Sequence, residues 1–301
     1  PDPRDSASNP EPMPDMRHYL GRDIKGMKIG VPKEYFIAGM EPGVTAAIEE
    51  ALATLESLGA TVDRTLSLPS TDHALAVYYI IAPSEASANL ARYDGVKYGF
   101  SVRSGATMWE NMEQTRAQGF GNEVKRRIML GTYALSAGYY DAYYLKAQKV
   151  RTVINNEFAE AFAKYDVIVT PTSPTVAFPI GAKVDDPYAM YLNDIYTLPA
   201  SVAGLPAVSV PCGFSEGLPV GMQIIGNFFD EGRILPSVVV GLQDFAGTGV
   251  LAGEYLAASK SLPGGVTVTA GLGWGRLGSD GALGLKAIKA NGGRKTVSAC
   301  D

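Results

Sequence analysis

The run Val167-Ile168-Val169-Thr170 constrains the fold more than any other feature of this chain. Four consecutive β-branched residues are typical of a strand that is buried on both faces of a sheet. The segment Pro171-Thr172-Ser173-Pro174-Thr175 stops this strand. A strand without a polar face favours a sheet covered by helices, which is the α/β class.

A β-α-β unit near the start of the chain supports the same class. Residues 27–31 predict a strand, residues 44–58 carry apolar positions at helical spacing and end at Gly59, and residues 60–68 predict a second strand. Such a unit favours parallel pairing. It contains no GxGxxG sequence, so we do not expect a dinucleotide site. Further helices are expected at 71–92, 122–134 and 140–164, and a hairpin at 207–214 and 219–228, joined by Ser215-Glu216-Gly217-Leu218.

Composition and charge exclude several classes of function. The 301 residues, 46% of them hydrophobic, are enough for one large domain or two ordinary ones, and the net charge of −5 argues against a broad nucleic-acid footprint. With only two cysteines and two histidines, neither a zinc site nor a histidine-based triad is expected, and so no metal. No apolar run reaches the roughly 20 residues of a membrane helix, so we expect no membrane contact. A first residue other than Met suggests a fragment or a processed chain.

Arg127 is placed unusually for a charged residue. Val124, Arg127, Ile128 and Gly131 follow the spacing of one helix face, and Gly131 is expected to leave room above the guanidinium. Arginine stays charged, and a half-buried one needs an anion that its planar fork can pair. Two partners remain open at this point: an internal Asp or Glu, or the carboxylate of a ligand.

The chain changes character near residue 235. We expect a linker over residues 1–26, an α/β unit over 27–235, a foreign β-rich segment over 236–279, and disorder over 280–301. Of the 34 glycines, 14 lie in residues 236–301. The alternation over residues 264–276 favours antiparallel β-ribbon.

Residues 1 to about 235 resemble the C-terminal half of the amidase-signature family, and within it the A subunits of tRNA-dependent amidotransferases. The likeness rests on ordered segments that include Lys28-Ile29-Gly30-Val31-Pro32-Lys33-Glu34-Tyr35, Ala86-Ser87-Ala88-Asn89-Leu90-Ala91-Arg92-Tyr93-Asp94-Gly95 and Gly221-Met222-Gln223-Ile224-Ile225-Gly226. The resemblance implies a mixed β-sheet flanked by helices. The glycine content and the alternation described above predict a Gly-rich β-type tail after it. The resemblance also implies amide hydrolysis by a Ser-Ser-Lys arrangement, in which lysine activates one serine through a second.

The chain departs from the family at that catalytic segment. It contains no Gly-Gly-Ser-Ser run, and the serines and the lysine would lie before Pro1. We therefore expect no catalytic residue in this chain and no activity from it alone. Ser173 and Ser201 are not promoted into the vacant role.

The resemblance places three substrate-binding residues, Tyr78, Arg127 and Asp194, at positions that contact glutamine. Arg127 would pair the α-carboxylate, and Asp194 the α-ammonium. Asp194 lies in an apolar and aromatic stretch, Tyr191-Leu192-Asn193-Asp194-Ile195-Tyr196, where a lone carboxylate is disfavoured. Two alternatives stay open: Asp194 as a helix-end or turn residue, and Tyr78 as core packing.

The resemblance also implies partners and a location. The whole subunit would hydrolyse glutamine in the cytoplasm and pass ammonia to partner subunits B and C, which amidate Glu-tRNA(Gln) or Asp-tRNA(Asn). ATP and Mg are expected on the partner, and no cofactor on this chain. One alternative is another amide hydrolase of the same family; a second is a non-catalytic binding or envelope protein. Residues 236–279 are similar to exopolysaccharide-associated outer-membrane lipoproteins, so a chimeric reading frame is expected rather than a purposeful fusion.

Overall fold

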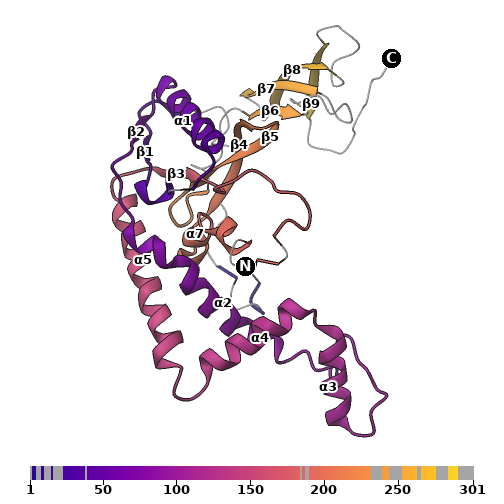
Figure 1. Ribbon diagram of the computed structural model, residues 1–301. Helices are drawn as coiled ribbons and strands as arrows, with labels where there is room; N and C mark the ends of the chain where they lie inside the picture. Colours follow the sequence, from indigo (N-terminus) through magenta and orange to yellow (C-terminus); the bar gives the residue numbers. More distant parts are fainter. Residues whose placement is uncertain are drawn as a thin grey trace.

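A computed structural model of the chain contains a five-stranded mixed sheet in the order β2-β1-β3-β5-β4 (Figure 1). Its strands are β1 (Lys28–Gly30), β2 (Thr61–Asp63), β3 (Val167–Pro171), β4 (Ala207–Ser215) and β5 (Leu218–Ile225). Strand β1 pairs in parallel with β2 and β3, while β5 pairs antiparallel with β3 and β4. The expected α/β class, with a mixed sheet and a parallel β-α-β unit, is confirmed.

The structure describes residues 2–4, 8–9, 15, 23–37, 39–183, 185–186 and 190–231, and the backbone of 239–243, 253–262, 266–275 and 284–290. Most of the expected linker over residues 1–26, and the boundary near residue 235, lie outside the described residues.

Helices cover both faces of the sheet. They are α1 (Pro42–Ser57), α2 (Ala74–Leu90), α3 (Met108–Gly119), α4 (Asn122–Leu135), α5 (Lys146–Phe162) and α7 (Leu198–Ala203), with shorter turns η2 (Lys33–Tyr35), η3 (Pro69–His73), η4 (Asp141–Leu145) and η5 (Leu192–Asp194). Val167 and Val169 of β3 pack with α1, whereas Ile168 packs with α5 and α7 on the opposite face. All three side chains are at most 2% exposed, so β3 is buried on both faces as predicted.

The hairpin expected at Ser215–Leu218 joins β4 and β5. Its two central residues, Glu216 and Gly217, both have positive φ, at 54° and 78°. Two successive positive φ angles define a type I′ turn, whose twist matches that of antiparallel strands. Glycine takes this conformation without strain at the second position.

The second expected strand, over residues 60–68, is wrong in length, because β2 ends at Asp63. The Asp63 carboxylate accepts hydrogen bonds from the backbone and hydroxyl of Thr65, which turns the chain. Beyond that turn, Glu34 accepts hydrogen bonds from the Ser67 hydroxyl and the Leu68 amide. Side-chain partners, one local and one distant in sequence, have therefore replaced the strand ladder.

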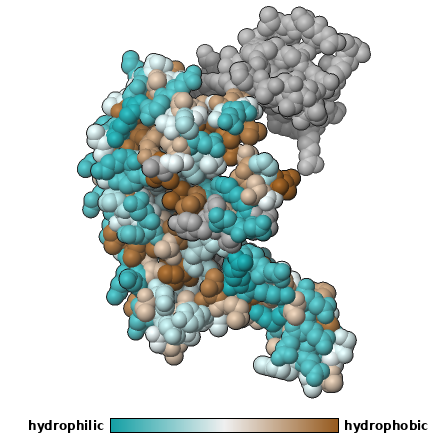
Figure 2. Space-filling view, viewed as in Figure 1, coloured by the Kyte–Doolittle hydropathy of each residue, from teal (hydrophilic) through white to brown (hydrophobic). Residues whose placement is uncertain are grey.

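Helix α3 was not expected from apolar periodicity, because among its residues only Thr115 is buried. Thr107 caps it by accepting a hydrogen bond from the Glu110 amide, and this Thr-x-x-Glu spacing is a recognised start signal. Figure 1 shows α3 standing away from the sheet, and Figure 2 shows the same arm as a largely hydrophilic projection.

A second, antiparallel sheet has the order β6-β7-β8-β9, and its strands pair only with one another. They are β6 (Val239–Gln243), β7 (Gly253–Leu262), β8 (Val266–Gly275) and β9 (Gly284–Ala290). Strand β8 is the antiparallel ribbon expected over 264–276. Strand β9 lies within 280–301, where we expected disorder because the sequence carries little signal there; residues 280–283 and 291–301 lie outside the described residues.

No helix in the described part of the chain is long and apolar enough to cross a membrane.

Candidate functional site

Arg127 lies on the inward face of α4, as its helical spacing predicts. Val124 and Ile128 beside it are half-buried, and Gly131 is buried. The Arg127 side chain is 32% exposed, whereas that of Arg126 next to it is 53% exposed. The predicted helix phase is therefore confirmed.

The Arg127 guanidinium is held by two neighbours and faces a third. It donates to the Tyr78 hydroxyl at 3.3 Å and to the Glu123 carboxylate at 3.0 Å. Its central carbon lies 5.8 Å from the centre of the Tyr79 ring, within cation–π range. The hydrogen bond to Tyr78, followed by pairing with Glu123, raises the pKa of Arg127 above its usual value, against the opposing effect of burial. Tyr78 is thus a polar partner of Arg127 as well as part of the packing.

Glu123 is the anion that pairs with Arg127, but it satisfies Arg127 only in part. It lies one turn earlier on the same helix and is 48% exposed, so it is not an internal acid. Arg126 also pairs with it, at 3.2 Å. Two guanidiniums therefore share one carboxylate, and neither has a carboxylate to itself.

Gly131 corrects one expectation, since its missing side chain does not leave room above Arg127. A Cβ built there would lie 1.9 Å from the Pro83 carbonyl oxygen of α2. The space is filled by helix α2, which approaches α4 closely at this point. The close approach explains why Tyr78, on α2, reaches Arg127, on α4.

Asp194 ends the short helix η5, and its side chain is exposed rather than enclosed by the aromatic residues around it in the sequence. The apolar setting expected for it is therefore wrong: the tight turn of η5 directs the Asp194 side chain outward, while Tyr196 is buried. Among the described residues, Asp194 forms no side-chain hydrogen bond or ion pair, including with Arg127. Its carbonyl accepts from Thr197, consistent with the helix-end alternative.

The charges of Arg127 and Asp194 both affect the pKa of Tyr79. Burial, followed by the neighbouring Tyr191 phenol, raises the pKa of Tyr79 to about 12; the Arg127 charge lowers it, and the Asp194 charge raises it further. Arg127 and Asp194 thus act on one ring with opposite signs. The structure brings Tyr78 and Arg127 into contact and places Asp194 within electrostatic range of the same surface.

Gln223 is a buried polar residue whose role sequence reasoning missed. From β5 its side-chain amide donates to the Thr170 hydroxyl at 2.8 Å and to the Tyr196 carbonyl at 2.9 Å. It therefore fastens the chain two residues after Asp194 to the central sheet. In the sequence, the only sign of this role is a side-chain amide within a strand that is otherwise apolar.

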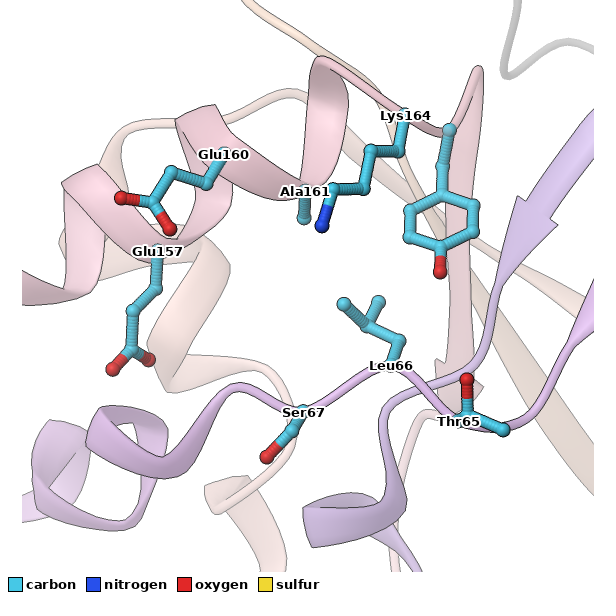
Figure 3. A pocket seen from close by; sticks show the side chains of 8 residues that line it. Thr65, Leu66, Ser67, Glu157, Glu160, Ala161 and Lys164 are labelled. Carbon is cyan, nitrogen blue, oxygen red and sulfur yellow. The ribbon is translucent and has the colours of Figure 1, made fainter.

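Three described cavities lie elsewhere, and none of them is lined by Tyr78, Arg127 or Asp194. One, of about 300 Å³, is shown in Figure 3, with the Lys164 side chain extending into it from the turn that follows α5. Glu157 at its edge is already occupied, because it accepts from the Ser70 hydroxyl at 2.6 Å. Another, of about 310 Å³, is lined by Thr172 and Ser173, which follow β3, and by Asn193 of η5.

Within the part of the chain that the structure describes, no lysine amine is hydrogen-bonded to a serine hydroxyl. The described residues also contain no group of three His, Cys, Asp or Glu side chains that could hold a metal ion.

Comparison with known families identifies the family to which this chain is similar. Residues 1–235 match the sequence model of the family described as Amidase. The chain belongs to the amidase family. Residues 221–297 of this amidase-family chain also match a family described as exopolysaccharide biosynthesis protein YbjH.

Curated relatives agree with the family match. The chain is 62% identical over 234 residues to the A subunit of glutamyl-tRNA(Gln) amidotransferase from Chloroflexus aggregans, covering 78% of this chain and 48% of the relative. It is also 62% identical over 234 residues to the protein of the same name from Moorella thermoacetica, with the same coverage. The chain thus spans about half the length of the curated relatives it matches.

A solved structure agrees as well. The crystal structure of the A subunit of glutamyl-tRNA(Gln) amidotransferase from Thermotoga maritima is similar, with a TM-score of 0.60 and 43% identity. The similarity covers 78% of this amidase-family chain and 46% of that structure. An aryl acylamidase of the amidase signature family, at 21% identity and a TM-score of 0.55, shares the fold.

Proposed function

We propose that this chain recognises the amino-acid end of glutamine, as part of the A subunit of a tRNA-dependent amidotransferase. The observation that carries the proposal is the arrangement around Tyr79. The Arg127 guanidinium lies 5.8 Å from the centre of that ring, and the Tyr191 ring, at the start of the short helix η5 that carries Asp194, packs against it at 4.3 Å. An amino-acid zwitterion needs one cationic and one anionic partner.

The charges around this surface fit that ligand. Arg126 and Arg127 share the single carboxylate of Glu123, which leaves positive charge for an α-carboxylate. Asp194 is exposed and forms no ion pair among the described residues, so its charge remains for an α-ammonium. The Tyr78 hydroxyl fixes the direction of the Arg127 guanidinium before any ligand arrives.

The wider role rests on the relatives, which are named as A subunits of glutamyl-tRNA(Gln) amidotransferases. We propose that the whole protein hydrolyses glutamine in the cytoplasm, with subunits B and C as partners and an aminoacyl-tRNA as acceptor. ATP and Mg would act on the partner. Ammonia transfer to Glu-tRNA(Gln) or Asp-tRNA(Asn) completes the proposed reaction.

Titration calorimetry with three ligands tests the recognition step. The first is L-glutamine, the second is glutaramate, which lacks the α-amino group, and the third is γ-aminobutyramide, which lacks the α-carboxylate. We expect glutamine to bind about tenfold or more tightly than either analogue, since each analogue leaves one charged partner unused. Equal affinity for all three would support a plain amide hydrolase of the same family instead.

A further inference from the structure

Tyr191 joins the two parts of the proposed glutamine site. Its ring lies 4.3 Å from the Tyr79 ring, centre to centre, at 40°. Its hydroxyl accepts a hydrogen bond from the Arg126 guanidinium at 3.3 Å. One side chain thus contacts both helix α2 and helix α4, which carry Tyr78 and Arg127.

Tyr191 also stands at a fixed relation to Asp194. The backbone of Tyr191 is helical, and η5 continues from it through Asp194. In a 3₁₀-helix, residues three apart lie on the same side because there are three residues per turn. Tyr191 and Asp194 therefore share one side of η5, and a ring seated on Tyr79 determines where the Asp194 carboxylate lies.

The other anchors of this segment do not set that relation. Gln223 binds the Tyr196 carbonyl to the sheet, and Lys183 donates to the Asn193 side chain at 2.7 Å. Neither anchor contacts α2 or α4 through these bonds. Helix α7 packs on α2 only from Leu198 onward, whereas Tyr191 contacts both α2 and α4 at the start of η5 itself.

We infer that Tyr191 is a positioning residue, which holds the Asp194 carboxylate at the spacing from Arg127 that a zwitterionic amino acid requires. This inference rests on the proposed function. Tyr191 itself contributes an aromatic surface and a hydroxyl acceptor to the protein and needs no contact with glutamine.

The first experiment measures hydrogen exchange and needs no ligand. The amides of Ile195 and Thr197 donate to the carbonyls of Leu192 and Asp194, so their exchange reports on the order of η5. In the full chain, Tyr191→Ala should speed their exchange about tenfold or more, while Tyr191→Phe, which keeps the ring, should change it far less. The amide of Gly226, bonded to the Pro206 carbonyl, is the control for global opening. Unchanged exchange of Ile195 and Thr197 in Tyr191→Ala would overturn the inference, whether or not glutamine binds.

The second experiment compares L-glutamine with glutaramate, which has no ammonium for Asp194. Tyr191→Ala should weaken glutamine binding about tenfold and leave glutaramate binding within about twofold, so that the preference for glutamine disappears. Tyr191→Phe should retain most of that preference. An equal loss for both ligands would mean that Tyr191 touches the ligand and would overturn the positioning role. If glutamine does not bind the unmodified chain, the proposed function fails, and the exchange experiment still decides whether Tyr191 holds η5.

Discussion

The backbone of Gly131 lies directly against the carbonyl of Pro83, so helices α4 and α2 touch without an intervening side chain. A Cβ at residue 131 would lie 1.9 Å from the Pro83 oxygen and 2.8 Å from the Ser84 nitrogen. Backbone atoms cannot move aside as the end of a flexible side chain does. This contact fixes the distance between the helix that carries Tyr78 and the helix that carries Arg127.

Replacing Gly131 by alanine is therefore expected to lower the free energy of unfolding by more than about 2 kcal/mol, because overpacking forces the two helices apart. Denaturant titration measures the change. Gly121→Ala on the same helix is the matched control, since a Cβ there meets nothing within 4 Å. It should cost at most about 1 kcal/mol, the scale of a helix-cap substitution. Equal losses for the two variants would contradict the close contact.

A hydrogen bond between Tyr165, which precedes β3, and Asp63, at the end of β2, should make stability depend on pH. The Tyr165 hydroxyl donates to the Asp63 carboxylate at 2.6 Å and, as the largest of several causes, lowers the pKa of that carboxyl. A carboxyl whose pKa is lowered by folding stabilises the protein above its unfolded pKa, near 3.9, and loses that contribution as the pH falls further.

Tyr165→Phe should accordingly lower the free energy of unfolding by about 1 kcal/mol near neutral pH, the usual net value of one hydrogen bond. The difference from the unmodified protein should shrink as the pH falls below the unfolded value of about 3.9 and the Asp63 carboxylate becomes protonated. Urea unfolding at the two pH values provides the measurement. A difference that stays the same at both would show that the carboxylate charge is not involved.

Residues 236–301 are expected to contribute little to the amidase-family fold. Their strands pair only with one another, in the second sheet. Deleting them should change the free energy of unfolding of residues 27–235 by less than about 1 kcal/mol, since no ladder of the first sheet is lost. Denaturant unfolding of both chains, with limited proteolysis alongside, tests this. A loss above about 2 kcal/mol would show that the segment packs on the first sheet.

Local sequence patterns predicted the part of the fold that depends on burial and turn chemistry. The β-branched run at β3, the apolar spacing of α4 and the Glu216-Gly217 turn each carry their signal in adjacent residues. Strand β2 was predicted too long because residues 67–68 donate hydrogen bonds to Glu34, more than 30 residues away in sequence, and so lie outside the ladder. Such distant partners cannot be found from periodicity.

The candidate site shows the same limit. Arg127 was recognisable because a cation on an apolar helix face needs an explanation. The roles of Gly131 and Tyr191 depend on which helices meet, and nothing within either segment specifies its neighbour. The resemblance named Asp194, whereas its exposure follows from the short helix η5, which apolar spacing did not reveal.

Recognition of glutamine by Arg127 and Asp194 is the central claim, and titration calorimetry of the corresponding alanine variants tests it most directly. Arg127→Ala and Asp194→Ala should each weaken L-glutamine binding by about 2 kcal/mol, the scale of a charge-assisted hydrogen bond. Asp194→Ala should leave glutaramate binding unchanged, and Arg127→Ala should leave γ-aminobutyramide binding unchanged. Arg126→Ala should cost less than about 1 kcal/mol, because its side chain is 53% exposed and the Tyr191 ring keeps its contact with Tyr79 when Arg126 is removed. Equal losses at positions 126 and 127, or variants that bind glutamine as the unmodified chain does, would contradict the account.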